Sequence, residues 1–192
     1  MRLRLLVVAA VLAGLTISAC RREAPEPPPP PPPAEEEPGP DMDSLRAYQD
    51  SVERAYQDSI RRAEERARAV AEARSILEQR IHFEFDRSRI TPEAEQVLRR
   101  KLPILRNSPD VRIRLEGHTD ERGSVEYNQA LGMRRAQSVL DWMAQNGVPA
   151  ARFQTTSYGE ERPLVNRSDE TAWAQNRRVE FIITAGADRI NP

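Results

Sequence analysis

The chain of 192 residues has little net charge, one cysteine, two histidines and one lysine. Acids and bases are evenly mixed from Ile81 onward and the formal net charge of the whole chain is −1, so no field draws the protein to nucleic acid or to an anionic surface. A nucleic-acid role is therefore not expected. Lys101 is the only lysine, so nearly every basic residue is an arginine. The choice of arginine over lysine therefore says nothing about function, and only the position of an arginine can.

The apolar run near the start, residues 5–17, is too short to span a bilayer. Arg2 and Arg4 precede it and small residues follow it, a pattern that is typical of an export signal. The sole cysteine, Cys20, ends the sequence ISAC, which resembles the lipobox of bacterial lipoproteins. In a lipobox, cleavage before the cysteine leaves it as a lipid-bearing N-terminus. A lone cysteine within a discarded signal is the alternative.

We expect residues 1–19 to be a lipoprotein signal peptide and Cys20 to be the lipidation site. Each buried methylene adds about 0.8 kcal/mol to membrane binding, so the several acyl chains of such lipoproteins, palmitate among them, make a durable anchor. By the same resemblance, Arg21 after the cysteine favours the outer membrane, because retention at the inner membrane usually requires Asp there. The expected location is the periplasmic face of the outer membrane.

Residues 20–40 begin with this cysteine and continue with many prolines, several glutamates and no large apolar side chain. Such a segment cannot build a core, and proline favours the extended polyproline II form. We expect a disordered, semi-rigid tether with a reach of roughly 60 Å. A PxxP ligand for a signalling domain is the alternative, but a linker is favoured directly after a lipid anchor.

Residues 41–80 contain no Gly or Pro and are rich in Ala, Arg and Glu, which favour helix. We expect one long helical stalk of about 60 Å. From Tyr56 to Leu77 the apolar residues recur at alternating spacings of four and three, but the stripe is thin and mostly alanine. A single solvated helix and a weakly self-associating coil both fit this pattern.

Residues 81–184 carry the patterns of a folded domain, and a short tail, 185–192, follows. The sequence IHFEFD alternates and predicts a half-buried strand with Ile81, Phe83 and Phe85 on one face. VRIRLEG alternates in the same way and should bury its three apolar residues. FQTTSYG and RRVEFIIT complete a set of four strands.

Helical patterns lie between these strands. Thr91 and Pro92 mark the start of the first helix, which Pro103 should kink or end. A second helix should run from the N-cap Ser124 to near Gln145, and a short one precedes the last strand. The order β-α-β-α-β-(α)-β predicts an α+β sandwich, with one mixed four-stranded sheet covered by helices.

The second helix carries two polar residues on its apolar side. At about 100° per residue, Asn128 and Arg135 fall within the stripe that includes Leu131. Burying a guanidinium without a partner is costly, so Arg135 should meet an anion or reach a cleft. The nearest acid by topology is Asp120, in the loop GHTDERGS at residues 117–124. An Asp120–Arg135 ion pair that only fastens the loop is the alternative to a ligand site.

Several long motifs occur in order in the domain: FEFDRSRITPEAEQVL, LEGHTDERGSVEYNQALGMRRAQSV, SYGEERP and NRRVEF. Together they resemble the OmpA C-terminal-like domain family over residues 81–183, which implies the fold of that family. With the lipobox and tether, the chain resembles the peptidoglycan-associated lipoproteins (Pal) of the family more than its barrel-bearing members. Pro103 and the long charged stalk depart from the family pattern, but both lie outside the ligand motif.

In that family the motif binds the diaminopimelate side chain of uncrosslinked peptidoglycan stem peptides without covalent bonds. The resemblance implies that Asp120 accepts the ligand ammonium and that Arg135 clamps a carboxylate. The chemistry agrees, because a zwitterionic side chain is paired fully by one acid and one arginine. The resemblance further implies five residues that line the pocket: Phe85, Asp86, Arg122, Asn128 and Leu131. Asp86 and Arg122 are equally compatible with solvated turn residues.

The resemblance implies a protein that holds the outer membrane to peptidoglycan within a Tol-Pal-type system, with a TolB-like periplasmic partner, and supports envelope integrity and cell division. An envelope spacer without Tol partners is one alternative. A motor-stator-like wall anchor is a second alternative. A stator, however, needs a membrane-spanning helix that carries an acidic residue, and residues 5–17 are short and contain no acidic residue.

The loop also raises the question of catalysis. His118 with Asp120 resembles a general-base pair, and His82 with Glu116 resembles part of a zinc site. However, His82 and Glu116 should project from the outward faces of strands, no third ligand appears at a suitable spacing, and no Ser or Cys nucleophile lies in an elbow. We expect no enzyme, cofactor or metal site, and we expect His118 to pack or to hydrogen-bond at the strand end.

Overall fold

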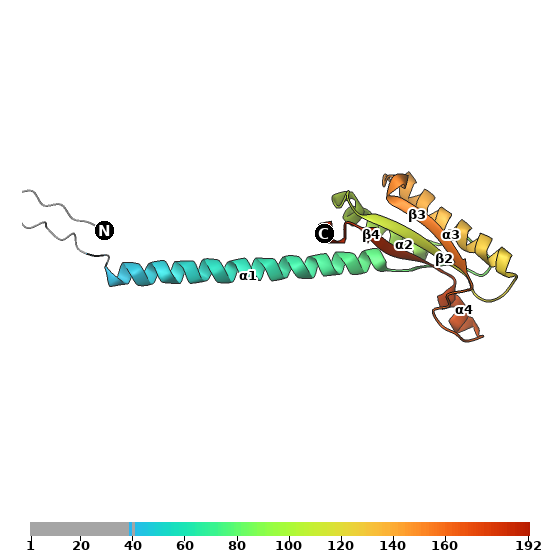
Figure 1. The fold of residues 1–192 in the computed structure, drawn as a ribbon, viewed down its shortest axis with the longest axis horizontal. Coiled ribbons are helices and arrows are strands. Elements are labelled where there is room, and N and C mark those ends of the chain that lie inside the picture. The colour runs from blue at the N-terminus through green and yellow to red at the C-terminus, as the bar shows by residue number, and fades with distance from the viewer. Residues whose placement is uncertain (1–38, 40) are drawn as a thin grey trace, which may run out of the picture. The chain divides into compact units, whose positions relative to one another are not determined.

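The computed structural model describes residues 39 and 41–192. The helices are α1 (Met42–Glu78), α2 (Pro92–Asn107), α3 (Val125–Gln145) and α4 (Glu170–Asn176), with short 3-10 turns at Ala150–Arg152 and Ala187–Arg189 (Figure 1). The strands are β1 (Ile81–His82), β2 (Arg112–His118), β3 (Phe153–Gly159) and β4 (Arg178–Ala185). The predicted signal peptide, the predicted lipidation site and nearly all of the predicted tether lie outside the described residues. Within the described part of the chain, no helix combines the length and the hydropathy that a bilayer crossing requires.

The four strands form one mixed sheet in the order β1-β4-β2-β3. β4 runs antiparallel to both of its neighbours, and β2 and β3 are parallel. This confirms the mixed four-stranded sheet. The expected strand over 81–86 is wrong in its length, because the chain turns after Phe83 and Asp86 adopts a left-handed φ of 53°. Phe85 therefore leaves the buried face and is 54% exposed.

Both long helices of the domain begin at the predicted caps. The Thr91 hydroxyl accepts the N–H of Ala94 at 3.2 Å, and the Ser124 hydroxyl accepts the N–H of Tyr127 at 3.2 Å. The sequence predicts that Pro103 kinks or ends α2. It does not end the helix, because α2 continues to Asn107. The side chain of Pro103 is exposed, so its ring faces solvent and does not disturb the core.

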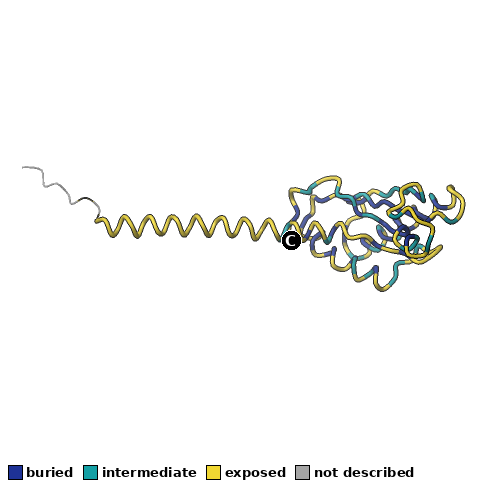
Figure 2. Tube along the Cα trace, turned by 90° about the horizontal axis from the view of Figure 1, so that it is seen from below, coloured by how far each residue is buried: buried dark blue, intermediate teal, exposed yellow. Residues whose placement is uncertain are grey.

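One apolar core joins α2, α3 and one face of the sheet. It is built from buried residues of both helices and of the two central strands, among them Leu98, Leu105, Val139, Met143, Ile113, Leu115 and Phe181. Figure 2 shows this burial along the strands and the inner sides of the helices. Each such side chain contributes about 1.5–3 kcal/mol when it leaves water, and together they fix α3 on the sheet.

Two glycines let α3 approach the sheet closely. A Cβ on Gly117 of β2 would lie 1.9 Å from the carbonyl oxygen of Gly132 in α3, and a Cβ on Gly132 would lie 2.3 Å from the Ser157 hydroxyl. Neither position therefore tolerates a side chain without a shift of the backbone. This contact brings the first half of α3 down onto the end of β2, where the loop GHTDERGS begins.

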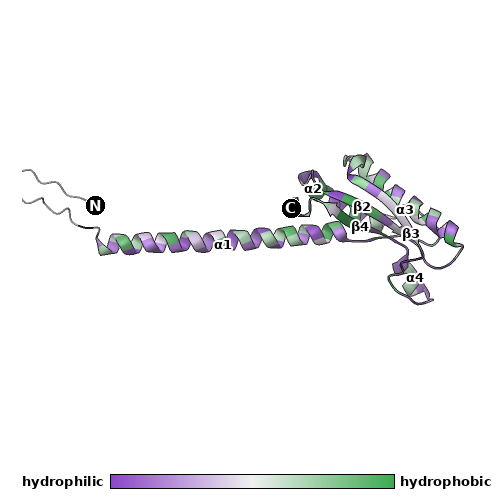
Figure 3. Cartoon of the chain, in the orientation of Figure 1, coloured by the Kyte–Doolittle hydropathy of each residue, from purple (hydrophilic) through white to green (hydrophobic). Residues whose placement is uncertain are grey.

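The stalk predicted over residues 41–80 is the helix α1, which is exposed along most of its length (Figure 2). Polar and apolar residues alternate along it without a broad apolar face (Figure 3). Its last turns differ, because Ala73 and Leu77 are buried in the domain core. The fully buried ammonium of Lys101 in α2 donates to the carbonyls of Ile76, Leu77 and Gln79 at 2.7–2.8 Å. These bonds fix the end of α1 to the domain.

Candidate functional site

A pocket of about 230 Å³ lies where three segments meet: the turn after β1, the loop between β2 and α3, and the first turns of α3. All seven residues that the sequence predicts as ligand contacts line this pocket: Phe85, Asp86, Asp120, Arg122, Asn128, Leu131 and Arg135. Thr119, Gly123 and Tyr127 complete the lining. The structure thus brings the candidate residues together in one place. Their contacts with a ligand stay a prediction.

The carboxylate of Asp120 is buried, with 3% of the residue exposed. It accepts hydrogen bonds from the side chain of Arg122, the shorter of them 2.7 Å long, and from Arg177 at 3.3 Å. Burial alone would raise the pKa of Asp120, but the hydrogen bonds from Arg122 and Arg177 outweigh it and hold the pKa below 3.8. Asp120 is therefore ionised at neutral pH.

Arg135 is fully buried, at 0% exposure. Its guanidinium donates to three main-chain carbonyls, those of Arg87 at 2.8 Å, His118 at 2.8 Å and Glu84 at 3.1 Å. Burial lowers the pKa of Arg135 to about 10, so the side chain is a cation at neutral pH. No ion pair joins Arg135 to Asp120 in the part of the chain that the structure describes, and the fastening pair considered from the sequence is absent.

These three bonds leave part of the guanidinium free. An arginine has five N–H donors, of which Arg135 uses one on Nε, one on Nη1 and one on Nη2. Two N–H groups have no acceptor among the described residues, and Arg135 lines the pocket. The prediction that Arg135 reaches a cleft is confirmed. Among residues 39 and 41–192, no carboxylate is paired with its positive charge.

Arg122 closes one side of the pocket and is about one-third exposed. Its guanidinium carbon lies 3.9 Å from the ring centre of Phe85 and 4.1 Å from that of Trp173. The two aromatic rings and the Asp120 carboxylate together hold this side chain across the pocket, by cation–π contact and by charge-assisted hydrogen bonds. Arg122 is thus not a free turn residue.

The other predicted residues hold the walls of the pocket. Asn128 donates to the Glu160 carboxylate at 2.5 Å and to the carbonyl of Arg122 at 3.3 Å, which ties two loops to α3. Asp86 accepts a hydrogen bond from the hydroxyl of Tyr127 and so links the turn after β1 to α3. The buried side chain of Leu131 supplies an apolar part of the lining.

Arg177 is a site residue that the sequence did not reveal. It is buried between α4 and β4 and donates to the Phe83 carbonyl at 3.1 Å, to Asp120 at 3.3 Å and to Glu170 at 2.8 Å. It therefore helps to position Asp120, and it donates to the same carboxylate oxygen, Oδ2, as Arg122. In the sequence it is one of two adjacent arginines before a strand, and nothing distinguishes it there from an exposed residue.

Two further expectations concern His118 and Glu116. His118 is buried and stacks on Tyr158, with ring centres 5.6 Å apart, so the packing role is confirmed. It forms no pair with Asp120, because neither ring nitrogen has a hydrogen-bond partner among the described residues. Glu116 projects from the face of the sheet opposite the helices, as expected, but it is buried there and pairs with Arg114 at 2.7 Å.

A mixed sheet with helices on one face and a small charged pocket at the end of β2 defines an α+β domain with a candidate ligand site. Residues 82–177 match the OmpA family, and the chain belongs to that family. The peptidoglycan-associated lipoprotein of Brucella melitensis is 46% identical over 110 residues, which are 57% of this chain and 65% of the relative. The protein of the same name from Pseudomonas aeruginosa is 50% identical over 100 residues, 52% of this chain and 59% of the relative.

Two solved structures share this fold. The peptidoglycan-associated lipoprotein from Burkholderia pseudomallei aligns with a TM-score of 0.54 at 35% identity, covering 55% of this chain and 90% of that one. The C-terminal domain of Helicobacter pylori MotB aligns with a TM-score of 0.53 at 24% identity, covering 58% and 88%, and shows the fold alone. The chain thus spans 59–65% of the length of the two curated relatives and most of each solved domain.

Proposed function

We propose that this protein is an outer-membrane lipoprotein that holds the cell wall non-covalently, by binding the diaminopimelate side chain of peptidoglycan stem peptides in the pocket. The observation that carries the proposal is the buried guanidinium of Arg135, which lines the same pocket as Asp120 and has two N–H groups without an acceptor among the described residues. Relatives 46–50% identical to the chain are named peptidoglycan-associated lipoproteins, which supports the assignment.

The ligand carboxylate is expected at Arg135. The three carbonyls keep the guanidinium in place before the ligand arrives, so little side-chain entropy is lost on binding. Each charge-assisted hydrogen bond contributes about 1.5–3 kcal/mol, and a few of them account for micromolar affinity. A lysine-containing stem peptide has no side-chain carboxylate and would leave the two N–H groups unpaired.

The ligand ammonium is expected at Asp120, whose carboxylate already accepts hydrogen bonds from Arg122 and Arg177. Of these two arginines, Arg177 is buried and held by two further partners, whereas Arg122 is partly exposed. We therefore expect Arg122 to move aside when the ammonium binds, and Arg177 to stay and keep Asp120 ionised. Its existing contacts with the rings of Phe85 and Trp173 can hold Arg122 once its bonds to Asp120 are broken.

Sedimentation of the full chain with insoluble cell-wall sacculi tests the proposal. The full chain is required, because a fragment that begins at Ile81 would remove Leu77 and the carbonyls that hold Lys101. The test variant is Arg135→Lys, which keeps a positive charge and loses the planar fork. The matched control is Arg134→Lys, the same change at the exposed neighbouring position of α3.

Wild type and Arg134→Lys should sediment with the sacculi, and Arg135→Lys should stay in the supernatant. Retention of Arg135→Lys at the wild-type level would contradict the assigned role of Arg135. Failure of the wild type to sediment would contradict wall binding itself. Circular dichroism of the three proteins before the assay shows whether Arg135→Lys is folded.

We further propose that the protein acts in a Tol-Pal-type system with a TolB-like periplasmic partner, and that it supports envelope integrity and cell division. This proposal rests on the resemblance of the chain to the peptidoglycan-associated lipoproteins, whose names do not mention such a partner. A deletion strain should leak periplasmic protein and divide poorly, and the wild-type gene should restore both. Restoration by Arg135→Lys would favour the alternative of an envelope spacer that does not need the pocket.

Weak self-association through α1 is also proposed. Its first half carries six exposed large apolar residues: Met42, Leu45, Tyr48, Val52, Tyr56 and Ile60. Sedimentation equilibrium of the full chain should show a dimer at high concentration that the double change Val52→Asp and Ile60→Asp abolishes. A monomer at every concentration would leave α1 as a solvated single helix.

A further inference from the structure

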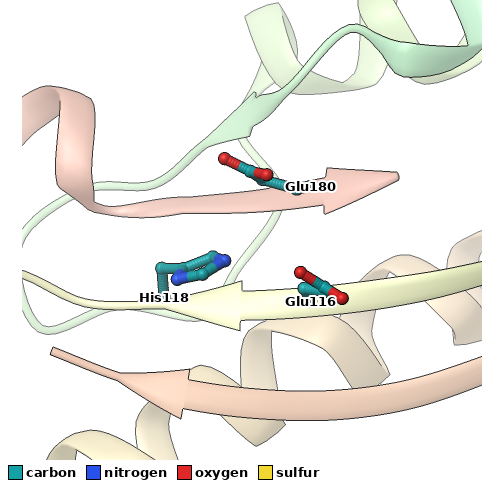
Figure 4. A group of neighbouring side chains, drawn as sticks. All are labelled: Glu116, His118 and Glu180. Carbon is teal, nitrogen blue, oxygen red and sulfur yellow. The ribbon is translucent and has the colours of Figure 1, made fainter. Parts of the chain in front are cut away.

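A second group of polar residues lies outside the pocket, on the face of the sheet opposite the helices. Glu116 and His118 project from β2 and Glu180 projects from β4, all to the same side (Figure 4). Glu116 and Glu180 are direct partners across the antiparallel pair. Two carboxylates in that relation repel each other, so the arrangement requires compensation by positive charge.

Arginines supply part of this compensation and leave part of each carboxylate free. Arg114 donates to Oε1 of Glu116 at 2.7 Å, and Arg178 and Arg80 donate to Oε1 of Glu180 at 2.7 and 3.0 Å. No hydrogen bond reaches Oε2 of either carboxylate from any residue in the described ranges. Each glutamate therefore has one oxygen that can bind a further cation.

His118 is the unexplained member of the group. It is 2% exposed, and both ring nitrogens are buried without a hydrogen-bond partner among the described residues. A buried imidazole normally satisfies at least one nitrogen, because an unmet donor or acceptor costs about 1–3 kcal/mol. Its ring lies in the space between the two strands, beside both carboxylates (Figure 4).

One ligand atom from each of the three residues lies within 4.8 Å of the other two. Zinc bonds to imidazole and carboxylate are 2.0–2.2 Å long, which places tetrahedral ligands about 3.4 Å apart. Rotation of the two glutamate side chains covers this difference while β2 and β4 stay paired. Three protein ligands would leave a fourth position for water.

We propose that Glu116, His118 and Glu180 bind a divalent first-row transition metal ion, with Zn²⁺ as the best match to one imidazole and two carboxylates. The three neighbouring arginines repel the ion, so we expect micromolar affinity and not the tight binding of a structural zinc site. Hard cations such as Mg²⁺ should not bind, because the imidazole is a poor ligand for them. This inference does not rest on the proposed wall binding.

Titration calorimetry of the full chain with ZnCl₂, after treatment with EDTA, tests the proposal. The test variant is His118→Gln, and the matched control is His82→Gln, which changes the other histidine of the chain. We expect wild type and His82→Gln to bind the same number of zinc ions and His118→Gln to bind one fewer. Any zinc held by Cys20 or by surface acids is common to all three proteins and cancels in this comparison.

A second variant covers the case in which His118→Gln does not fold. Glu180→Gln keeps the shape of the side chain and should weaken zinc binding at least tenfold, and Co²⁺ should show a visible absorption band in the wild type that this variant lacks. Equal zinc binding by wild type, His118→Gln and Glu180→Gln would overturn the proposal. So would the absence of zinc binding by the wild type, in which case a buried water is the partner of His118.

Discussion

Two buried cations of this domain make the same kind of hydrogen bonds but lie in different surroundings. Arg135 in α3 and Lys101 in α2 are both at 0% exposure, and each donates to three main-chain carbonyls. Neither is paired with a carboxylate in the described part of the chain. Arg135 lines the candidate pocket, whereas Lys101 lies under the end of α1 and against the ring of Phe181.

The number of donors explains the difference. An ammonium has three N–H groups, and Lys101 uses all of them to join α1 to the domain. A guanidinium has five, so Arg135 can be fixed by three carbonyls and still offer two donors to a ligand. The same kind of contact thus makes a joint between α1 and the domain at one place and holds a residue of the candidate binding site at the other.

The largest effect is expected from Arg135→Ala, which should damage both the fold and the site. The change leaves three main-chain carbonyls without their hydrogen-bond donor and a cavity in place of the side chain. The free energy of unfolding should therefore fall by about 3–5 kcal/mol, and wall binding should be lost. This revises the expectation, formed from the sequence, that the fold would stay intact. Urea denaturation and sacculus sedimentation measure the two effects. Loss of binding at full stability would show that the carbonyl contacts contribute little.

Asp120→Asn should act mainly on the site. The change removes the charge that pairs the ligand ammonium, so binding to sacculi should weaken by about 2–5 kcal/mol. The loss of stability should be smaller than for Arg135→Ala, because Arg177 keeps its bonds to Phe83 and Glu170. Binding isotherms of the variant and the wild type measure the first quantity. Unchanged affinity would remove Asp120 from the proposed contacts.

Lys101→Met should act on the joint alone. It removes three charged hydrogen bonds to the end of α1 but fills the space with an apolar chain, so we expect a loss of about 2–4 kcal/mol in the free energy of unfolding. Sedimentation with sacculi should be unchanged under conditions in which the variant is folded. A loss of wall binding in a folded Lys101→Met protein would contradict the claim that Lys101 only joins α1 to the domain.

The smallest effect is the change in the free energy of unfolding over a single pH unit, which also belongs to the joint. Burial lowers the pKa of Lys101 from 10.5 to about 7. Between these two values the unfolded chain binds a proton that the folded chain has released, so the free energy of unfolding should rise with pH, by at most about 1.4 kcal/mol per pH unit. Lys101→Met should lack this part of the slope. Identical pH profiles of the two proteins would show that Lys101 stays charged when it is folded.

The sequence allowed the prediction of features that repeat along one element. Helical periodicity placed Arg135 and Asn128 on the apolar side of α3, and both are buried there. Features that depend on a second element were not accessible. Arg177 and Trp173 contact the pocket residues Asp120 and Arg122 from the α4 region. Glu180 meets Glu116 only through the pairing of β4 with β2. The early end of β1 likewise depends on the turn at Asp86, which alternation alone does not reveal.

The central claim is that Arg135 keeps two N–H groups for a ligand carboxylate. Calorimetric titration of the full chain with a stem peptide that contains diaminopimelate, and with the same peptide that contains lysine, tests it most directly. We predict at least tenfold tighter binding of the diaminopimelate peptide, which corresponds to about 1.4 kcal/mol, and a loss of this preference in Arg135→Lys. Equal affinity of the wild type for the two peptides would contradict the account.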